Sequence, residues 1–251
     1  MKIKQELETL FGAIRFFTRL PVPAWVGHNS ESLQKSSRYM PLIGLIVGAL
    51  GALVFVGTSY FWPKTLAVLA SMIATLRITG VFHEDGWSDM IDGFGGGWEK
   101  AQILSIMKDS RIGNYGAVGL IMMLLGKFCA LIEFDMQQLP LALIAGHAFS
   151  RLCANYVMHR LDYARDEGKA KPLSTHISNG ELLFATLSGV LPLVFFPPLQ
   201  LIPAVVLALL ASVWLARMFR RRIGGYTGDC LGAVQQLAEI AFYAGLLCRF
   251  S

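Results

Sequence analysis

Long apolar stretches separated by short polar segments run through most of the chain. Several of these stretches approach the ~20 residues that an α-helix needs to cross the hydrocarbon core of a bilayer. In the first stretch, Gly44, Gly48 and Ala52 form a ridge of small residues, and such a ridge lets another helix pack closely. The fifth stretch is short, so the pattern predicts about six to seven transmembrane helices. The candidate spans are residues 40–62, 65–82, 115–132, 139–158, 182–196, 199–218 and 231–247.

The N-terminal segment, residues 1–23, is predicted to be an amphipathic helix that lies on the membrane surface. Apolar residues recur in it at helical spacing and basic residues lie between them, a pattern typical of interfacial helices. Arg15 interrupts the apolar run and no small-residue cleavage site follows, which argues against a signal peptide. Pro21 and Pro23 end the predicted helix.

The composition agrees with an all-α, polytopic membrane bundle built as a single domain, residues 1–251. Hydrophobic residues make up 54% and charged residues 16% of the chain, whereas a soluble domain carries about 25% charged residues. The net charge of +5 is typical of membrane proteins with basic cytoplasmic loops, so the expected partner is membrane lipid and not nucleic acid. The four cysteines show no C-x-x-C spacing and are predicted to be small buried hydrophobes.

The distribution of basic residues predicts an N-terminus in the cytoplasm. With seven spans and this orientation, the outer segments hold only Lys64 and Arg249 of the 22 basic residues. Arg77, Lys127 and Arg151 lie within spans, and all the others fall in cytoplasmic segments, as the positive-inside rule requires. The same orientation places every motif described below on the cytoplasmic side.

An acidic stretch follows the second span directly and opens a polar segment, residues 83–114, that is predicted to be a cytoplasmic catalytic loop. Asp85, Asp89 and Asp92 are spaced four and three residues apart, which places them on one face of a helix. A merely solvated helix start would not explain this shared face. Hard carboxylate oxygens favour Mg²⁺ or Mn²⁺ over Zn²⁺, so these aspartates are the predicted metal ligands and catalytic residues. His83 is a candidate to orient a carboxylate or to act as a base.

A second cluster has the composition of an anion site. Lys108, Asp109, Ser110, Arg111 and Gly113 lie just before the third span. Basic side chains, a hydroxyl and the free N–H groups at a helix start are typical phosphate ligands, so these residues are predicted to bind substrate. A cytoplasmic loop with positive-inside charges is the alternative interpretation.

The third cluster is a glycine-rich turn in the second motif loop, residues 219–229. Glycines allow close contact with a phosphate or a base, so Thr227 and Asp229 are predicted to bind substrate, and Asp229 is also able to join a metal. Glu239 lies within the last span, where a carboxylate is costly unless it is paired. Its candidate partners are three basic residues within other spans, Arg77, Lys127 and Arg151.

Metal, phosphate and hydroxyl ligands on one membrane face favour phosphoryl or nucleotidyl transfer at the bilayer surface. The sequence contains no Walker loop, no G-x-S-x-G motif and no zinc signature. A small transporter with charged pathway residues is a rival class, but its outer loops would be very short. A structural membrane subunit is another, and it leaves the carboxylate spacing unexplained.

Three motifs together resemble the cobalamin synthase family, whose members are adenosylcobinamide-GDP ribazoletransferases. A looser likeness to CDP-alcohol phosphotransferases rests on Asp89-x-x-Asp92-Gly93, but the Ala-Arg and the later aspartate pair of that family are missing. The stretch Phe17-Thr18-Arg19-Leu20-Pro21-Val22-Pro23 also fits the N-terminal pattern of the first family. The three motifs that resemble the cobalamin synthase family are His83-Glu84-Asp85-Gly86-x-x-Asp89-x-x-Asp92-Gly93, Met107-Lys108-Asp109-Ser110-Arg111-Ile112-Gly113 and Gly225-x-Thr227-Gly228-Asp229-x-x-Gly232-Ala233.

The resemblance implies a reaction and a location. The 3′-hydroxyl of α-ribazole, or of its 5′-phosphate, attacks the phosphorus next to cobinamide in adenosylcobinamide-GDP, and GMP leaves. Mg²⁺ is the implied cofactor, with a further ligand to be found among Asp85, Asp109 and Asp229. The implied protein is a multi-pass enzyme of the bacterial cytoplasmic (inner) membrane whose active site faces the cytoplasm, and a homo-oligomer is compatible with it. The alternatives are a CDP-alcohol-type phosphotransferase and a small membrane transporter.

Overall fold

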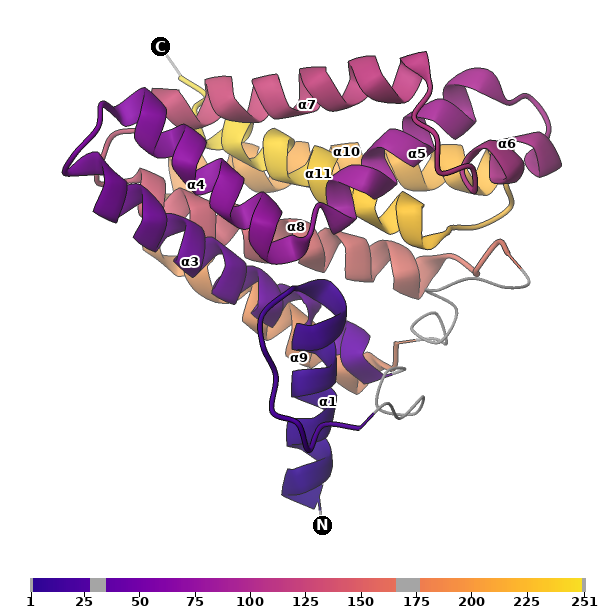
Figure 1. Ribbon diagram of the computed structural model, residues 1–251, viewed down its shortest axis with the longest axis horizontal. Helices are drawn as coiled ribbons and strands as arrows, with labels where there is room; N and C mark the ends of the chain where they lie inside the picture. The colour runs from indigo at the N-terminus through magenta and orange to yellow at the C-terminus, as the bar shows by residue number, and fades with distance from the viewer. Residues whose placement is uncertain (1, 28–34, 166–176, 250–251) are drawn as a thin grey trace.

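Helices packed side by side form nearly all of the described structure (Figure 1). The computed structural model describes residues 2–27, 35–165 and 177–249. Short 3-10 helices, η1 (Ser36–Tyr39) and η3 (Leu191–Phe195), precede α3 and α10. The α-helices are α1 (Lys2–Phe17), α3 (Met40–Ser59), α4 (Lys64–Thr79), α5 (Phe82–Gly96), α6 (Lys100–Ile106), α7 (Asn114–Glu133), α8 (Leu139–Arg160), α9 (Asn179–Val190), α10 (Pro198–Arg222) and α11 (Gly228–Leu246).

The helices lie where the hydrophobic pattern predicts them, and the all-α class is confirmed. By length and composition, α10, α7, and α3 together with η1 are able to cross a membrane. Helices α4 and α5 pass the same test only as a pair, bent by 86°. The described residues therefore contain three candidate spans, or four with the bent pair. Membrane character is confirmed at this level; the count of six to seven spans is not.

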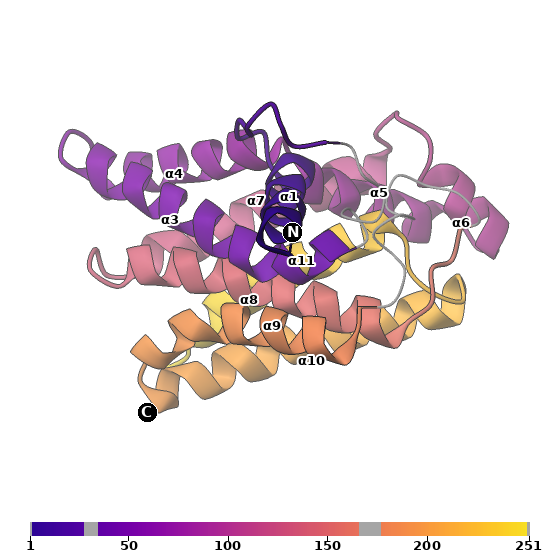
Figure 2. The same cartoon turned by 90° about the horizontal axis from the view of Figure 1, so that it is seen from below.

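The ridge of small residues predicted in α3 packs against α8. A Cβ atom at Gly48 would lie 2.6 Å from the Ile144 Cα atom, and one at Gly44 would overlap the backbone of His147. Only hydrogen atoms at these positions let the two backbones approach so closely. Figure 2 shows α3 and α8 beside each other in the middle of the molecule. The close-packing role predicted for the ridge is thus confirmed.

The N-terminal segment forms a helix that projects from the bundle at a steep angle (Figure 1). Glu6 of α1 binds Arg38 at 2.5 Å and accepts a hydrogen bond from Tyr39 at 2.9 Å. Beyond the helix, the backbone N–H of Arg19 donates to the Ile78 carbonyl at 2.7 Å. Carbonyls at a helix end lack intrahelical partners, so this contact of the N-terminal motif completes the end of α4.

A sharp corner joins α4 to α5. Gly80 and Val81 both have left-handed backbone conformations, with φ of 67° and 63°. Glycine adopts this region freely, whereas a β-branched residue does so rarely. After this corner, residues 83–114, which were predicted to form a polar loop, fold largely into α5 and α6. Their periodic acidic and apolar residues support an amphipathic helix.

The motif segments lie at one end of the bundle. Figure 1 shows the start of α7, the start of α11 and the end of α5 on one side, together with α6. The α3–α4 turn and the C-terminus lie on the opposite side. Arg222 near the end of α10 donates to the Gly97 carbonyl at 2.6 Å, which ties α10 to the end of α5. The three motif segments thus share one end of the molecule.

Candidate active site

Helix α5 presents the three predicted metal ligands on one face, here called the acidic face (Asp85, Asp89 and Asp92). Asp85 is exposed, Asp89 is half-buried and Asp92 is buried. A Cβ atom at Gly86 would lie 2.9 Å from the Asp229 carbonyl oxygen, so α5 and α11 cross closely at this point. The crossing brings a fourth carboxylate beside the acidic face, and Asp89 lies within electrostatic reach of Asp85, Asp92 and Asp229.

Asp92 is bound by the start of α7. Its Oδ2 atom accepts a hydrogen bond from the Gly113 N–H at 2.7 Å, and its Oδ1 atom accepts one from the Gly116 N–H at 2.8 Å. The first N–H groups of a helix lack intrahelical partners and favour negative charge. The anion site predicted at Gly113 therefore holds a carboxylate of the protein itself, and this contact links the first motif to the second.

The side chains of the second motif lie at the surface. Lys108, Ser110 and Arg111 are exposed, and Arg111 pairs with Asp109 at 2.7 Å. Hydrogen bonds from the Arg111 side chain and backbone lower the pKa of Asp109 to about 2. Among the described residues, no hydrogen bond or ion pair joins these side chains to the acidic face. The structure thus brings Gly113 to the aspartates and leaves Lys108 and the Asp109–Arg111 pair facing solvent.

The third motif forms the start of α11. Thr227 is the N-cap residue, and its hydroxyl accepts a hydrogen bond from the Cys230 N–H at 3.3 Å. The same hydroxyl lies 3.3 Å from Asp229 Oδ2. Thr227 is therefore buried as a helix cap, a role that sequence patterns favour for threonine. Burial raises the pKa of Asp229, whereas the Arg165 guanidinium and the Thr227 hydroxyl lower it.

Arg165 is a site residue that the sequence interpretation missed. Its Nη2 atom lies 3.1 Å from Asp229 Oδ2, and the side chain is largely buried. Backbone pairing holds it there: the Ala164 N–H donates to the Tyr226 carbonyl at 2.8 Å, and the Tyr226 N–H donates to the Asp162 carbonyl at 2.9 Å. This parallel bridge joins segments distant in sequence, so no local pattern around Arg165 could have revealed it.

The carboxylates have the donor chemistry that a hard divalent cation prefers. Asp85, Asp89 and Asp229 offer oxygen donors, which Mg²⁺ prefers. Among the described residues, no group of three or more His, Cys, Asp or Glu side chains is arranged to hold a metal ion. Mg²⁺ is usually held by one or two carboxylates, with waters and substrate phosphates completing its octahedron. The arrangement therefore fits Mg²⁺ as part of a substrate complex and does not form a closed protein cage.

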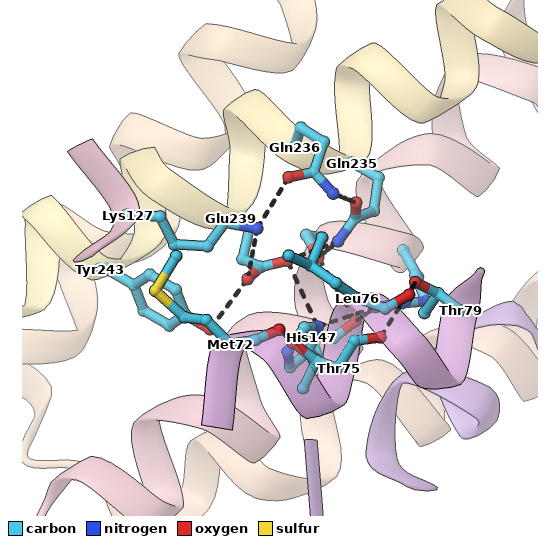
Figure 3. A network of polar contacts seen from close by, with 12 residues as sticks. Met72, Thr75, Leu76, Thr79, Lys127, His147, Gln235, Gln236, Glu239 and Tyr243 are labelled. Atoms are coloured by element: carbon cyan, nitrogen blue, oxygen red, sulfur yellow. Dashed lines mark hydrogen bonds and ion pairs between the residues drawn. The ribbon is translucent and has the colours of Figure 1, made fainter. Parts of the chain in front are cut away.

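A buried polar network lies behind the acidic face, and Figure 3 shows its members from α7, α8 and α11. Glu239 is at its centre and is 1% exposed. Its carboxylate lies 3.1 Å from Lys127 Nζ and 3.3 Å from His147 Nδ1, and it accepts hydrogen bonds from Gln235 at 2.6 Å and Tyr243 at 3.2 Å. Of the partners predicted for Glu239, Lys127 is thus confirmed as a direct one.

The network reaches α5 through Glu84. Gln236 accepts a hydrogen bond from Lys127 at 2.7 Å and donates one to Glu84 Oε1 at 2.8 Å. Arg151 approaches His147 Nδ1 at 3.2 Å. Two acidic and two basic side chains therefore meet in the interior, and buried charges need such pairing. Because Glu84 directly precedes Asp85, the network fixes the rotation of α5 about its axis.

A small cavity adjoins the other side of α5. It is bounded by α1, α5, α8 and α11, and its lining includes Phe17, Phe82, His83 and Tyr226. The Nδ1 atom of His83 and the hydroxyl group of Tyr226 are buried, and neither has a hydrogen-bond partner within the described chain. Unsatisfied buried polar atoms of this kind often mark the place of a water or a ligand group. His83 is 2% exposed, so it lies inward from the acidic face.

The helices and the site define an integral membrane protein that presents clustered carboxylates, beside arginine and lysine side chains, at one end of its bundle. The sequence profile described as cobalamin-5-phosphate synthase matches residues 9–247. The chain therefore belongs to the cobalamin-5-phosphate synthase family, and the family predicted from the three motifs is confirmed.

Curated relatives cover nearly the whole chain. A protein of Shewanella woodyi (strain ATCC 51908 / MS32) is 46% identical over 251 residues, which are 98% of this chain and 97% of its own length. One of Shewanella baltica (strain OS185) is 45% identical over 252 residues, 97% of this chain and 95% of its own. One of Shewanella frigidimarina (strain NCIMB 400) is 40% identical over 253 residues, with coverage of 98% and 97%. All three are named adenosylcobinamide-GDP ribazoletransferase. No solved structure matches the chain.

Proposed function

We propose that this protein transfers α-ribazole, or its 5′-phosphate, onto adenosylcobinamide-GDP. A hydroxyl oxygen of ribazole forms a bond to the phosphorus next to cobinamide, the bond from that phosphorus to the GMP oxygen breaks, and the hydroxyl proton passes to a base. The relatives' shared name supports the reaction. The observation that carries it is the meeting of the acidic face with Asp229 and Arg165 at one end of the bundle.

The diphosphate of the substrate would bind between the carboxylates and the basic side chains. We assign Asp85 and Asp229 as Mg²⁺ ligands, Asp229 being the further ligand that the sequence left open, with waters and substrate phosphates completing the coordination. Bound Mg²⁺ would neutralise diphosphate charge and stabilise the leaving GMP. Asp92 fixes the face to α7 through Gly113 and Gly116.

The basic residues divide the phosphate contacts between them. Arg165 is already beside Asp229 at 3.1 Å, so it is placed to bind a phosphate that enters next to this carboxylate. Arginine offers planar, paired N–H donors that match phosphate oxygens. Lys108 and Arg111 are exposed and are assigned to the outer phosphate, with Asp109 and Ser110 shaping that segment.

The proton acceptor is assigned to Asp89. It is half-buried and lies within the acidic face, where a hydroxyl group of ribazole would approach the phosphorus. His83 is the second candidate, but it is 2% exposed and the adjoining cavity of about 20 Å³ has room for a single water, so it would accept the proton only through a bound water. Thr227 supports the site as the cap of α11.

The membrane topology proposed with this function has six to seven spans in the bacterial cytoplasmic membrane. In this arrangement α8, α11 and the pair α9 with η3 also cross or enter the bilayer, and α1 lies at its surface. The motif end of the bundle then faces the cytoplasm, where both substrates are soluble. The basic residues near the end of α10, such as Arg220 and Arg221, support this orientation under the positive-inside rule.

The decisive experiment is reconstitution with defined substrates. Purified protein in lipid vesicles is incubated with adenosylcobinamide-GDP, α-ribazole and Mg²⁺, and GMP and the corrinoid product are separated by chromatography. We expect both products in equal amounts, and a loss on the order of 10²- to 10³-fold for Asp89→Asn, a magnitude typical of removing an electrostatic catalytic group. Asp135→Asn, in the turn at the opposite end of the bundle, is the control and should retain full activity.

Two outcomes would contradict the proposal. Uptake of substrate into vesicles without GMP release would favour a transporter. Full activity of Asp89→Asn, or full activity with a chelator in place of Mg²⁺, would remove the acidic face from the mechanism.

A further inference from the structure

A groove of about 480 Å³ lies between α8 and α10, away from the acidic face. Val157 of α8 and Leu209, Val213 and Ala216 of α10 form its apolar walls. Helix α10 is long and apolar enough to cross a membrane, and Leu209 and Val213 are exposed. The walls therefore face the hydrocarbon core of the bilayer, where an acyl chain is the natural occupant.

Three arginines line the same groove at one end. Arg160 ends α8, and Arg217 and Arg220 lie in the last turns of α10. All three side chains are exposed, and none has a hydrogen-bond or ion-pair partner among the residues that the structure describes. Like charges gathered in one groove repel each other unless an anion lies between them.

Helix α10 also marks the depth of this charged end in the membrane. Trp214 is 58% exposed and precedes Arg217 by one turn of the helix. Tryptophan is enriched where the hydrocarbon core meets the headgroups. The apolar walls therefore lie at acyl-chain depth and the arginines at phosphate depth, as in a phospholipid.

We propose that this groove binds one anionic phospholipid, with an acyl chain along the apolar walls and the headgroup phosphate among Arg160, Arg217 and Arg220. An anionic headgroup fits three guanidinium groups that have no ion-pair partner within residues 2–27, 35–165 and 177–249, whereas a zwitterionic lipid would bring an ammonium group toward them. The site is separate from the proposed active site, because Arg165 and Asp229 do not line the groove. Lipid binding in this groove therefore does not depend on the proposed reaction.

The test compares two neighbouring arginines of the same helix. Arg220 lines the groove, whereas Arg221 lines a different hollow beside Trp214. Full-length protein in neutral detergent is titrated with phosphatidylglycerol or phosphatidylcholine, and bound lipid is counted by native mass spectrometry. We expect one phosphatidylglycerol per chain, with phosphatidylcholine bound more weakly. Arg220→Gln should weaken phosphatidylglycerol binding on the order of fivefold, whereas Arg221→Gln should leave it unchanged.

A second variant tests the apolar part. Ala216→Phe fills the groove without changing charge and should also displace the lipid. Leu210→Phe, at an exposed α10 position outside the groove, is its control and should bind lipid normally. Thermal unfolding in detergent confirms that each variant is folded.

Several results would overturn the proposal. Equal binding of the two lipids would show that no headgroup site exists, and equal weakening by Arg220→Gln and Arg221→Gln would show only diffuse attraction of basic residues. Displacement of the lipid by adenosylcobinamide-GDP would mean that the groove belongs to substrate binding.

Discussion

Lys127 and Glu239 form an ion pair inside the helix bundle, where both side chains are buried. Lys127 is 6% and Glu239 1% exposed. Removing one partner of a buried pair leaves the other charge unpaired, which typically costs about 3–5 kcal/mol, whereas replacing both is often nearly neutral. Comparing the single variants with the double variant therefore tests whether the two charges stabilise the fold as a pair.

We therefore predict that Lys127→Met and Glu239→Gln each lower the thermal unfolding temperature strongly, while the double variant recovers most of the loss. Unfolding in detergent, followed by fluorescence or light scattering, checks this expectation. A double variant whose loss equals the sum of the two single losses would show that the two residues are not energetically coupled.

Arg165 offers a direct test of substrate binding. Arg165→Lys keeps the charge beside Asp229 but removes the planar guanidinium, which alone presents paired donors to phosphate. We expect KM for adenosylcobinamide-GDP to rise on the order of tenfold or more, the size of one lost charge-assisted hydrogen bond. KM for α-ribazole should change little; an equal rise for both substrates would indicate general disruption of the site. Arg221→Lys, at an exposed position of α10 outside both proposed sites, serves as the control.

At the scale of helices, the crossing of α5 and α11 depends on Gly86. Gly86→Ala would place a methyl group about 2.9 Å from the Asp229 carbonyl oxygen and push the carboxylates of the two helices apart. Overpacking of this kind costs about 1–3 kcal/mol, and we expect activity to fall with it. Gly126→Ala in α7 is the matched control, since nothing lies within 4 Å of its Cβ position. Gly126→Ala should keep wild-type activity in steady-state assays, and in unfolding experiments it should be as stable as the wild type or more stable.

The corner between α4 and α5 makes a second prediction at this scale. Val81 adopts φ of 63°, which costs a β-branched residue about 1–3 kcal/mol. Val81→Gly should therefore raise the unfolding temperature, whereas Val118→Gly, within α7, should lower it. A Val81→Gly variant that is less stable than the wild type would show that packing of the valine outweighs the backbone strain.

The sequence predicted the helices well because their apolar runs are long and their ends carry glycine, proline or polar clusters. Asp85, Asp89 and Asp92 could be assigned to one face because their spacing is local. Arg165 could not be found, because a backbone bridge to Tyr226 places it. The contact of the Arg19 N–H with the end of α4 could not be predicted either, because it also joins segments that are distant in sequence. Asp92 and Thr227 were read as ligand-binding residues, whereas both also satisfy backbone groups at helix starts.

For the whole molecule, the central prediction concerns orientation in the membrane. Single-cysteine variants at Trp98 and Phe61, both 83% exposed, report on opposite ends of the bundle after the native cysteines are replaced. We expect a membrane-impermeant maleimide to label Phe61→Cys in intact spheroplasts and Trp98→Cys only in inverted vesicles. The reverse pattern would place the motif end outside the cell and contradict the proposed topology.

The buried pair also has a consequence for the synthesis of the protein. Lys127 precedes its network partner Gln236 by 109 residues, so α7 emerges from the ribosome long before α11. An unpaired lysine near the bilayer centre opposes insertion by about 2.5–3.5 kcal/mol. Nascent chains that stop before α11 should therefore hold α7 poorly in the membrane and be degraded. We therefore expect α7 to be held stably in the membrane only once the last helix has been made.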